Sequence, residues 1–416
     1  MVGVLGFYLL PRMSFLLPSK NLKKIGKLGR YTPTELPIEI QSLISAGLTS
    51  VSTDGSVVPS LAASWEAKNE GKEYNFVLKE NLFWQDKTPI LAADINYNFS
   101  DVTTSVLDDK TIQFKLKEPF SPFPSIVSRP VFKKGLIGAG EYQVKSLIKR
   151  GQIVEKIVLV PKDPTLSTLT FRFYPTEEAA RTAFKLGEID VIKDVTHLAD
   201  LGQWPGIKIT NEVESSHYVA IFFNTQDEHL GDKSLRQALA YAIRKHWEPR
   251  AFNPINPNSW AYNPGVKSYR HDLENAKNLL AKSQEEKEEE AWIKEIELAT
   301  VPSLLSIAEE IAKDWGELGI EIKVKVINVI PEDFQALLVT QEVPPDPDQY
   351  TLWHSTQMTN LSRYKNPLID KLLEDGRRTL DKEERKEIYF DFQRFIVEEI
   401  PVIFLFHPTL YTISRE

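Results

Sequence analysis

The sequence predicts a globular protein of mixed α/β class with more than one lobe, and three observations support this. The chain has 416 residues, more than one hydrophobic core usually organises. Its hydrophobic share of 42% and charged share of 26% are those of ordinary globular domains and not of disordered chains. Apolar runs typical of strands also recur between segments with the spacing of helices.

The clearest α/β rhythm lies between residues 293 and 326. Residues 293–298 read as a strand, and residues 320–326 alternate between apolar and charged side chains. Between them, apolar residues three and four positions apart predict a helix that ends at Gly319: Leu304, Ile307, Ile311, Trp315 and Leu318. A strand, a helix and a strand at this spacing predict a βαβ unit with parallel pairing.

Further elements are predicted along the rest of the chain. Strands are expected at residues 24–32, 74–79, 111–116, 141–147, 219–223 and 402–406, the last two buried on both faces. Helices are expected at residues 38–44, 91–99, 176–187 and 233–244. One more helix is expected to begin after Asp381, with Glu384 completing a capping box, and to end at Pro401.

Composition and motifs argue against catalysis and against several kinds of partner. A net charge of −8 disfavours a nucleic-acid partner. The lack of cysteine excludes disulfides, thiolate catalysis, cysteine-ligated metals and a lipid-modified cysteine anchor. No metalloprotease, nucleophile-elbow or phosphate-loop motif occurs, and the seven histidines include no pair four residues apart. We therefore expect no catalytic residue, no metal site and no cofactor.

The N-terminal segment, residues 1–24, is apolar and then basic. Its apolar part, Met1–Pro18, is interrupted by Pro11 and Arg12 and falls short of the roughly 20 residues that span a bilayer. It also lacks the layout of a secretory signal. Two interpretations stay open: the end of a membrane anchor that begins outside this chain, which we prefer, and a segment lying on the membrane surface.

Aromatic residues next to polar loops are the first candidates for ligand binding. Trp260 and Tyr262 lie in a loop rich in asparagine and proline, and Trp353, His354 and Ser355 follow a loop rich in proline and aspartate. Such side chains offer a large, rigid contact area with a polar edge. The alternative, that Trp353 packs beneath the preceding strand, also stays open.

Several segments carry a family resemblance, and they occur in the family's order: Val57–Trp65, Tyr74–Lys79, Phe83–Asp86, Leu91–Asp94, Gly138–Tyr142, Phe222–Thr225 and Leu235–Ile243. They resemble the V-x-P-x-L-A-x-S-W, Y-x-F-x-L-R, W-x-D, T-A-x-D-V, G-T-G-P-Y, F-N-T and V-R-Q-A-L-x-Y-A-I elements of one family. That family is the family 5 extracellular solute-binding proteins, the dipeptide, oligopeptide and nickel receptors of ABC importers.

The resemblance implies a bilobal periplasmic-binding-protein-like α/β fold of type II, cluster C, with a reduced domain II insertion. Domain I would comprise residues 25–46, 122–224 and 402–416, domain II residues 47–121, and domain III residues 225–401. The implied protein is a monomer outside the cytoplasm that captures a peptide or other small solute by hinge closure and delivers it to an ABC transporter permease. A membrane-anchored sensor or scaffold without transport is the alternative, and an enzyme comes third.

The resemblance also bears on how the ligand is held. Peptide-binding members bind the ligand's α-ammonium with an aspartate shortly before a D-P-x element, and alignment on Asp346-Pro347-Asp348 puts Val343 at that position. Glu342, Asp346 or Asp348 could take this role, or the ligand lacks a free N-terminus. The candidate set is completed by three further residues: Phe222, Asn224 and Asn360.

Overall fold

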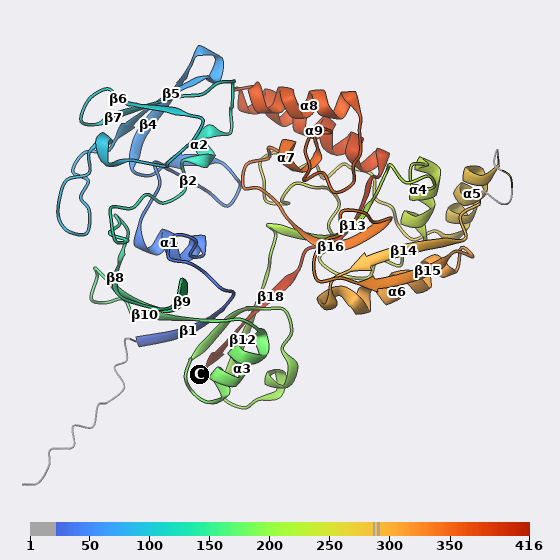
Figure 1. Cartoon of the computed structure of the whole chain (residues 1–416), viewed down its shortest axis with the longest axis horizontal. Coiled ribbons are helices and arrows are strands. Elements are labelled where there is room, and N and C mark those ends of the chain that lie inside the picture. Colours follow the sequence, from blue (N-terminus) through green and yellow to red (C-terminus); the bar gives the residue numbers. More distant parts are fainter. Residues whose placement is uncertain (1–21, 286–287, 289–291) are drawn as a thin grey trace, which may run out of the picture. The chain divides into compact units, whose positions relative to one another are not determined.

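The computed structural model describes residues 22–285, 288 and 292–416 (Figure 1). The chain forms two compact units built from segments distant in sequence. Unit 1 contains the residues up to Ile44, Gly140–Ile209 and Thr412–Glu416, and unit 2 contains Ser45–Ala139 and Thr210–Tyr411. Of the N-terminal segment, residues 1–24, the first 21 lie outside the described residues, and Leu22–Lys24 begin the first strand. The three-domain division stays a prediction.

Unit 1 is built on a seven-stranded sheet in the order β12-β18-β11-β1-β10-β9-β8. The predicted first strand, β1 (Leu22–Leu28), lies between β10 (Thr168–Tyr174) and β11 (Val191–Val195) and is parallel to both. The other strands are β8 (Tyr142–Arg150), β9 (Ile153–Pro161), β12 (Ile207–Val213) and β18 (Thr409–Arg415). Helix α1 (Ile38–Ile44) agrees with the prediction.

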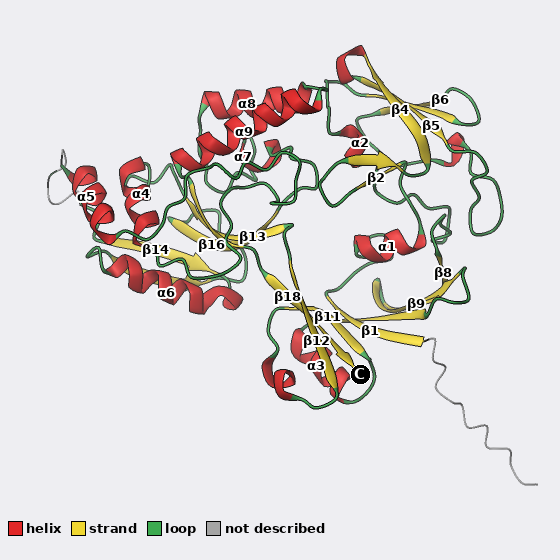
Figure 2. Cartoon of the chain, turned by 180° about the vertical axis from the view of Figure 1, so that it is seen from behind, coloured by secondary structure: helices red, strands yellow, loops and turns green. Residues whose placement is uncertain are grey.

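Helix α3 (Glu177–Lys185) packs against β1, β10 and β11 of unit 1 (Figure 2). The Thr176 side chain accepts a hydrogen bond from the Ala179 backbone N–H, which satisfies one of the free donors of the first turn. Ala180, Ala183 and Phe184 form the buried face. The predicted cap and helix are confirmed.

The first part of unit 2 is an antiparallel subdomain. Its four-stranded sheet has the order β4-β5-β7-β6, with β4 (Ala62–Lys68), β5 (Glu73–Leu78), β6 (Thr103–Val106) and β7 (Thr111–Lys115). A hairpin of β2 (Thr49–Val51) and β3 (Val57–Pro59) precedes it, and α2 (Phe123–Ile126) follows. Aromatic side chains pack together in its core: Tyr74, Phe76, Phe114 and Phe123.

The helix predicted at residues 91–99 is wrong. Only a single turn forms, at Ala92–Asp94, and the chain then continues without regular structure. The Asn96 side chain accepts a hydrogen bond from the backbone N–H of Asn98, and Asn98 has a φ of 54°. Asparagine side chains form such local turns in competition with helical bonds.

The larger part of unit 2 is organised by a five-stranded sheet in the order β15-β14-β16-β13-β17. Strand β14 (Glu295–Thr300) is parallel to β15 (Glu321–Val326) and to β16 (Ala336–Glu342). Helix α6 (Leu305–Gly316) packs along β14 and β15, so the predicted βαβ unit is confirmed (Figures 1 and 2). Strands β13 (His217–Phe223) and β17 (Val402–Phe406) are antiparallel neighbours, and Tyr218–Phe223 is buried.

Helices complete unit 2: α4 (Lys233–Ala242), α5 (Leu273–Gln284), α7 (Tyr350–Trp353), α8 (Pro367–Arg378) and α9 (Lys382–Glu399). The Asp381 side chain accepts from the Glu384 backbone N–H, as expected for the start of α9. At the other end Ile400 has a φ of 46° and precedes Pro401, which turns the chain into β17. Helices α8 and α9 pack against each other.

Candidate ligand-binding site

Most of the predicted site residues gather around one loop of unit 2, residues 343–353, between β16 and the end of α7. The Asp346 side chain accepts from the Asp348 backbone N–H at 3.0 Å, and the Asp348 side chain accepts from the Tyr350 N–H at 3.1 Å. Aspartates that bond the backbone two residues on are typical of tight turns. The local sequence therefore builds the loop and turns both carboxylates into the protein.

Asp346 and Asp348 are each paired with an arginine. The Arg385 guanidinium on α9 donates to Asp346 at 2.7 Å, and the Arg377 guanidinium at the end of α8 donates to Asp348 at 2.7 Å. Burial alone would lower the pKa of Arg385, but the nearby charge of Asp346 raises it above its ordinary value. Both carboxylates are thus neutralised within unit 2.

The aromatic candidates of the first loop lie next to this pair. The Trp260 backbone N–H donates to the Asp54 carbonyl at 2.8 Å, so the loop is fixed to the β2–β3 hairpin. The Arg385 guanidinium lies 5.5 Å from the centre of the Trp260 ring, within the range of a cation–π interaction. Tyr262 packs against a small apolar cluster that contains Tyr389, and burial raises the pKa of the Tyr262 hydroxyl.

Trp353 lies in the hydrophobic core of unit 2 and is 2% exposed. Its ring stacks on Phe222, with the ring centres 6.0 Å apart. This position agrees with the alternative that the sequence left open, in which Trp353 packs beneath the preceding strand. Its indole Nε1 nevertheless has no hydrogen-bond partner among the described residues.

His354 and Ser355 point towards α8. The Ser355 hydroxyl donates to Asp370 at 2.6 Å, and its backbone N–H donates to the same carboxylate at 2.8 Å. His354 Nδ1 lies 2.8 Å from the Thr356 hydroxyl. These contacts fix the chain after α7, and a ligand role for both residues stays a prediction.

The remaining candidates, Asn360, Asn224 and Glu342, lie outside the loop itself. Asn360 is buried and donates to the carbonyls of Trp353 at 3.2 Å and Tyr364 at 3.0 Å. Asn224 is buried, and its backbone N–H donates to the Gln335 carbonyl at 2.8 Å. Glu342, at the end of β16, is exposed. It is the candidate carboxylate for which no ion pair is recorded among the described residues.

Sequence analysis missed Gln349, which is fully buried in the same loop. In the part of the chain that the structure describes, neither its amide nitrogen nor its amide oxygen has a hydrogen-bond partner. Three further residues near the loop were not predicted from the sequence: Arg377, Arg385 and Tyr389. A signal existed for Arg385, because residues 385, 389, 392 and 396 continue the buried stripe of α9 at helical spacing. Gln349 lies in irregular backbone, where no such periodicity exists.

The site has binding groups rather than reactive ones. It offers aromatic rings, two neutralised carboxylates and a buried amide. No group of three or more His, Cys, Asp or Glu side chains is arranged to hold a metal ion within the described residues. Over the same ranges, no helix is both long and apolar enough to cross a membrane.

Comparison with known proteins decides the family. A profile of the bacterial extracellular solute-binding proteins, family 5 Middle, matches residues 56–360. The chain belongs to this family. The family's members are binding proteins and not enzymes, which confirms the prediction of a non-enzymatic role. Its extracellular character agrees with the predicted location outside the cytoplasm.

Individual family members are similar over most of their length. The dipeptide-binding protein of Escherichia coli K12 is 25% identical, over 86% of this chain and 82% of its own. Among solved structures, the ABC transporter substrate-binding protein CtaP of Listeria monocytogenes has a TM-score of 0.80 at 23% identity, covering 95% of this chain and 94% of its own. NikZ of Campylobacter jejuni, in complex with Ni(L-His), has a TM-score of 0.76 at 23% identity, with the same coverage. These two structures confirm the predicted periplasmic-binding-protein-like fold.

Proposed function

We propose that this chain is the solute-capturing component of an ABC importer and that its ligand is a peptide or a similar amide-bearing solute. Family membership and the likeness to a dipeptide-binding protein support the first part. The buried, unpartnered amide of Gln349 is the observation that carries the second part.

An amide side chain is chemically matched to a peptide backbone. Gln349 can donate through its NH₂ group and accept through its oxygen, and a peptide group needs one acceptor and one donor. The indole N–H of Trp353, four residues on, is a second unpartnered donor in the described structure. Because an unsatisfied buried polar group costs about 1–3 kcal/mol, a ligand that satisfies these groups gains that amount in affinity. Recognition through main-chain hydrogen bonds tolerates many side chains.

The pairing of the two aspartates bears on the ligand's N-terminus. Asp346 and Asp348 already hold arginine side chains at 2.7 Å. An ammonium group would have to compete with a guanidinium for either carboxylate. We therefore infer that these two residues shape the loop and that ligand affinity does not depend on a free α-ammonium bound to them.

Capture would follow the mechanism of two-lobed receptors. A ligand that contacts both lobes only in a closed state shifts the population towards that state. The protein would act as a monomer outside the cytoplasm and deliver its solute to a membrane permease. A role for the N-terminal segment in membrane association belongs to this proposal and needs its own test.

The proposal is tested by titration calorimetry with trialanine, N-acetyl-trialanine and the Ni(L-His)₂ complex, after native mass spectrometry of the purified protein. We expect a peptide-sized mass to co-purify and both peptides to bind with dissociation constants within about threefold of each other. Binding of the nickel complex without binding of either peptide would overturn the ligand class. A large loss on acetylation would assign the ammonium to a carboxylate, with Glu342→Gln as the next variant.

A further inference from the structure

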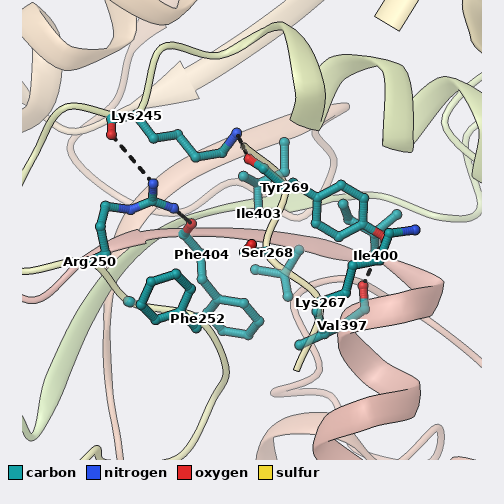
Figure 3. Close-up of a pocket in the computed structure, with 12 residues that line it drawn as sticks. Lys245, Arg250, Phe252, Lys267, Ser268, Tyr269, Val397, Ile400, Ile403 and Phe404 are labelled. Atoms are coloured by element: carbon teal, nitrogen blue, oxygen red, sulfur yellow. Dashed lines mark hydrogen bonds between the residues drawn. The ribbon is translucent and has the colours of Figure 1, made fainter. Parts of the chain in front are cut away.

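A small cavity in unit 2 lies apart from the 343–353 loop, between the segment after α4, the loop before α5 and strand β17 (Figure 3). Its volume is about 20 Å³, room for one water-sized species. Three of its lining residues carry positive charge, Lys245, Arg250 and Lys267, and none of the twelve is acidic. Ser268 adds a hydroxyl.

Lys245 is held by carbonyl groups that carry no net charge. Its ammonium donates to the carbonyls of Ala240, Tyr269 (2.8 Å) and Ile243 (3.4 Å). Two of these acceptors belong to the end of α4, where a cation is favourable. Burial and, to a smaller extent, the charge of Arg250 together lower the pKa of Lys245 to about 7. The hydrogen bonds are satisfied, but the charge is not balanced.

Arg250 faces the same cavity and is held in the same way. Its Nε donates to the Leu405 carbonyl at 2.7 Å. Its terminal nitrogens donate to the Lys245 and Phe404 carbonyls at 3.4 and 3.5 Å (Figure 3). These bonds use three of the five N–H groups of a guanidinium, which leaves two for another acceptor. Lys267, by contrast, pairs with Glu398 at 3.3 Å.

We propose that this cavity binds one small monovalent anion of the size of chloride, between the side chains of Lys245 and Arg250. Both side chains are partly buried, and their hydrogen bonds go to carbonyls and not to carboxylates, with Glu248 the nearby negative charge that acts on Arg250. An anion close to both cations offsets their repulsion and their partial loss of hydration. The volume excludes larger anions such as gluconate. Ser268, which is exposed, also lines the cavity.

Binding should depend on pH, because only the protonated Lys245 attracts the anion. The charged groups that act on Lys245 are Arg250, which lowers its pKa, and Asp314, which raises it. Lys267 and Tyr269 line the same cavity, with Lys267 already paired. An anion stabilises the ammonium form, so its effect should be larger at pH 6 than at pH 8.5.

The test uses bromide as the probe on the full chain. A crystal grown in sodium bromide should show an anomalous peak in the cavity. The melting temperature should be higher in sodium bromide than in sodium gluconate at equal ionic strength, with a larger difference at pH 6. Lys245→Met should abolish the difference, whereas Lys267→Gln, which removes a cation already paired with Glu398, should keep most of it.

Several results would overturn the proposal. Water density in the cavity with equal melting temperatures in both salts would show that it holds only water. A bromide peak without any difference in melting temperature would indicate an adventitious ion only. If Lys245→Met does not fold, the crystal and the pH dependence of the unmodified protein decide.

Discussion

The guanidinium of Arg385 donates to both carboxylate oxygens of Asp346, at 2.7 and 3.4 Å, and each side chain is less than 10% exposed. The pair joins α9 to the 343–353 loop, and Arg385 also donates to the Gly376 carbonyl at 2.8 Å. The Arg385 side chain thus connects α9 both to the loop and to the end of α8. This makes Asp346 a structural residue of the candidate site.

Replacing Asp346 should therefore affect folding more than ligand affinity. Asp346→Asn leaves the Arg385 charge buried without its partner, so we expect a loss of about 3 kcal/mol in the free energy of unfolding. Chemical denaturation measures this loss. Glu342→Gln changes an exposed carboxylate four residues before Asp346 and serves as the control, with little expected change in the free energy of unfolding. Unchanged stability together with lost ligand binding would instead show that Asp346 holds the ligand.

Arg377 connects the two parts of unit 2. The planar shape of its guanidinium should contribute to stability as much as its charge does. Its guanidinium lies 4.0 Å from the Tyr350 ring centre and 5.1 Å from that of Phe120, and it pairs with Asp348. Arg377→Lys keeps the charge but loses the planar stacking and the double hydrogen bond, so we expect a loss of about 1–2 kcal/mol in stability.

The neighbouring arginine provides the matched control for Arg377. Arg378 is exposed on the same turn of α8, and Arg378→Lys should change the free energy of unfolding by less than about 0.5 kcal/mol. Equal effects of the two substitutions would show that the stacking of Arg377 contributes nothing measurable.

The sequence predicted best those elements that are specified locally. Residues 293–326 combine alternation with helical spacing, and Asp381 caps a helix in its own vicinity, so both were confirmed. The helix predicted at residues 91–99 does not form, because Asn96 forms a local turn that competes with helical hydrogen bonds. Periodic segments, and the capping residues that precede them, can be recognised in one sequence, whereas a turn that one asparagine forms inside such a segment cannot.

The sequence marked the loop around which the candidate residues gather, but not the contacts that their side chains make. Proline and aspartate marked the 343–353 loop, and aromatic residues marked its surroundings. The partners of Asp346 and Asp348, however, are 39 and 29 residues away on two helices. Whether a carboxylate is free or paired depends on such tertiary contacts. Gln349 became visible only through its burial and its missing partners.

Lys245 should make stability depend on pH in a defined window. Its folded-state pKa is lowered to about 7, first by burial and then by Arg250, from an ordinary lysine value of about 10.4. Between these values the unfolded chain binds more protons than the folded protein, so stability rises with pH from about 7 to about 10. The slope from this one proton is at most about 1.4 kcal/mol per pH unit.

The measurement compares denaturation of the unmodified protein and Lys245→Met between pH 6.5 and 9.5, in gluconate buffer so that no small anion occupies the cavity. The unmodified protein should gain stability relative to the variant as pH rises. Parallel pH profiles would mean that Lys245 keeps its ordinary pKa when folded.

Substitution of Gln349 should change ligand affinity and protein stability in opposite directions, which distinguishes an effect on binding from an effect on folding. Its amide is fully buried and lacks partners among the described residues. Gln349→Met keeps the approximate volume and removes the unsatisfied groups, so the ligand-free protein should gain about 1 kcal/mol in stability. Affinity for trialanine should fall by about tenfold or more, because the ligand loses hydrogen bonds in a desolvated position.

Gln393 is a matched control for Gln349, because it is also fully buried but its amide is satisfied. It accepts from the Asn263 N–H at 2.8 Å and donates to the carbonyls of Ala261 and Tyr389 at 2.7 Å each. Gln393→Met should therefore lower stability by about 1–3 kcal/mol, the opposite direction from Gln349→Met. Calorimetry and thermal unfolding on both variants give the two readouts. If Gln349→Met destabilises the protein as Gln393→Met does and leaves peptide affinity unchanged, the Gln349 amide is a structural group, and the peptide-recognition role assigned to it is wrong.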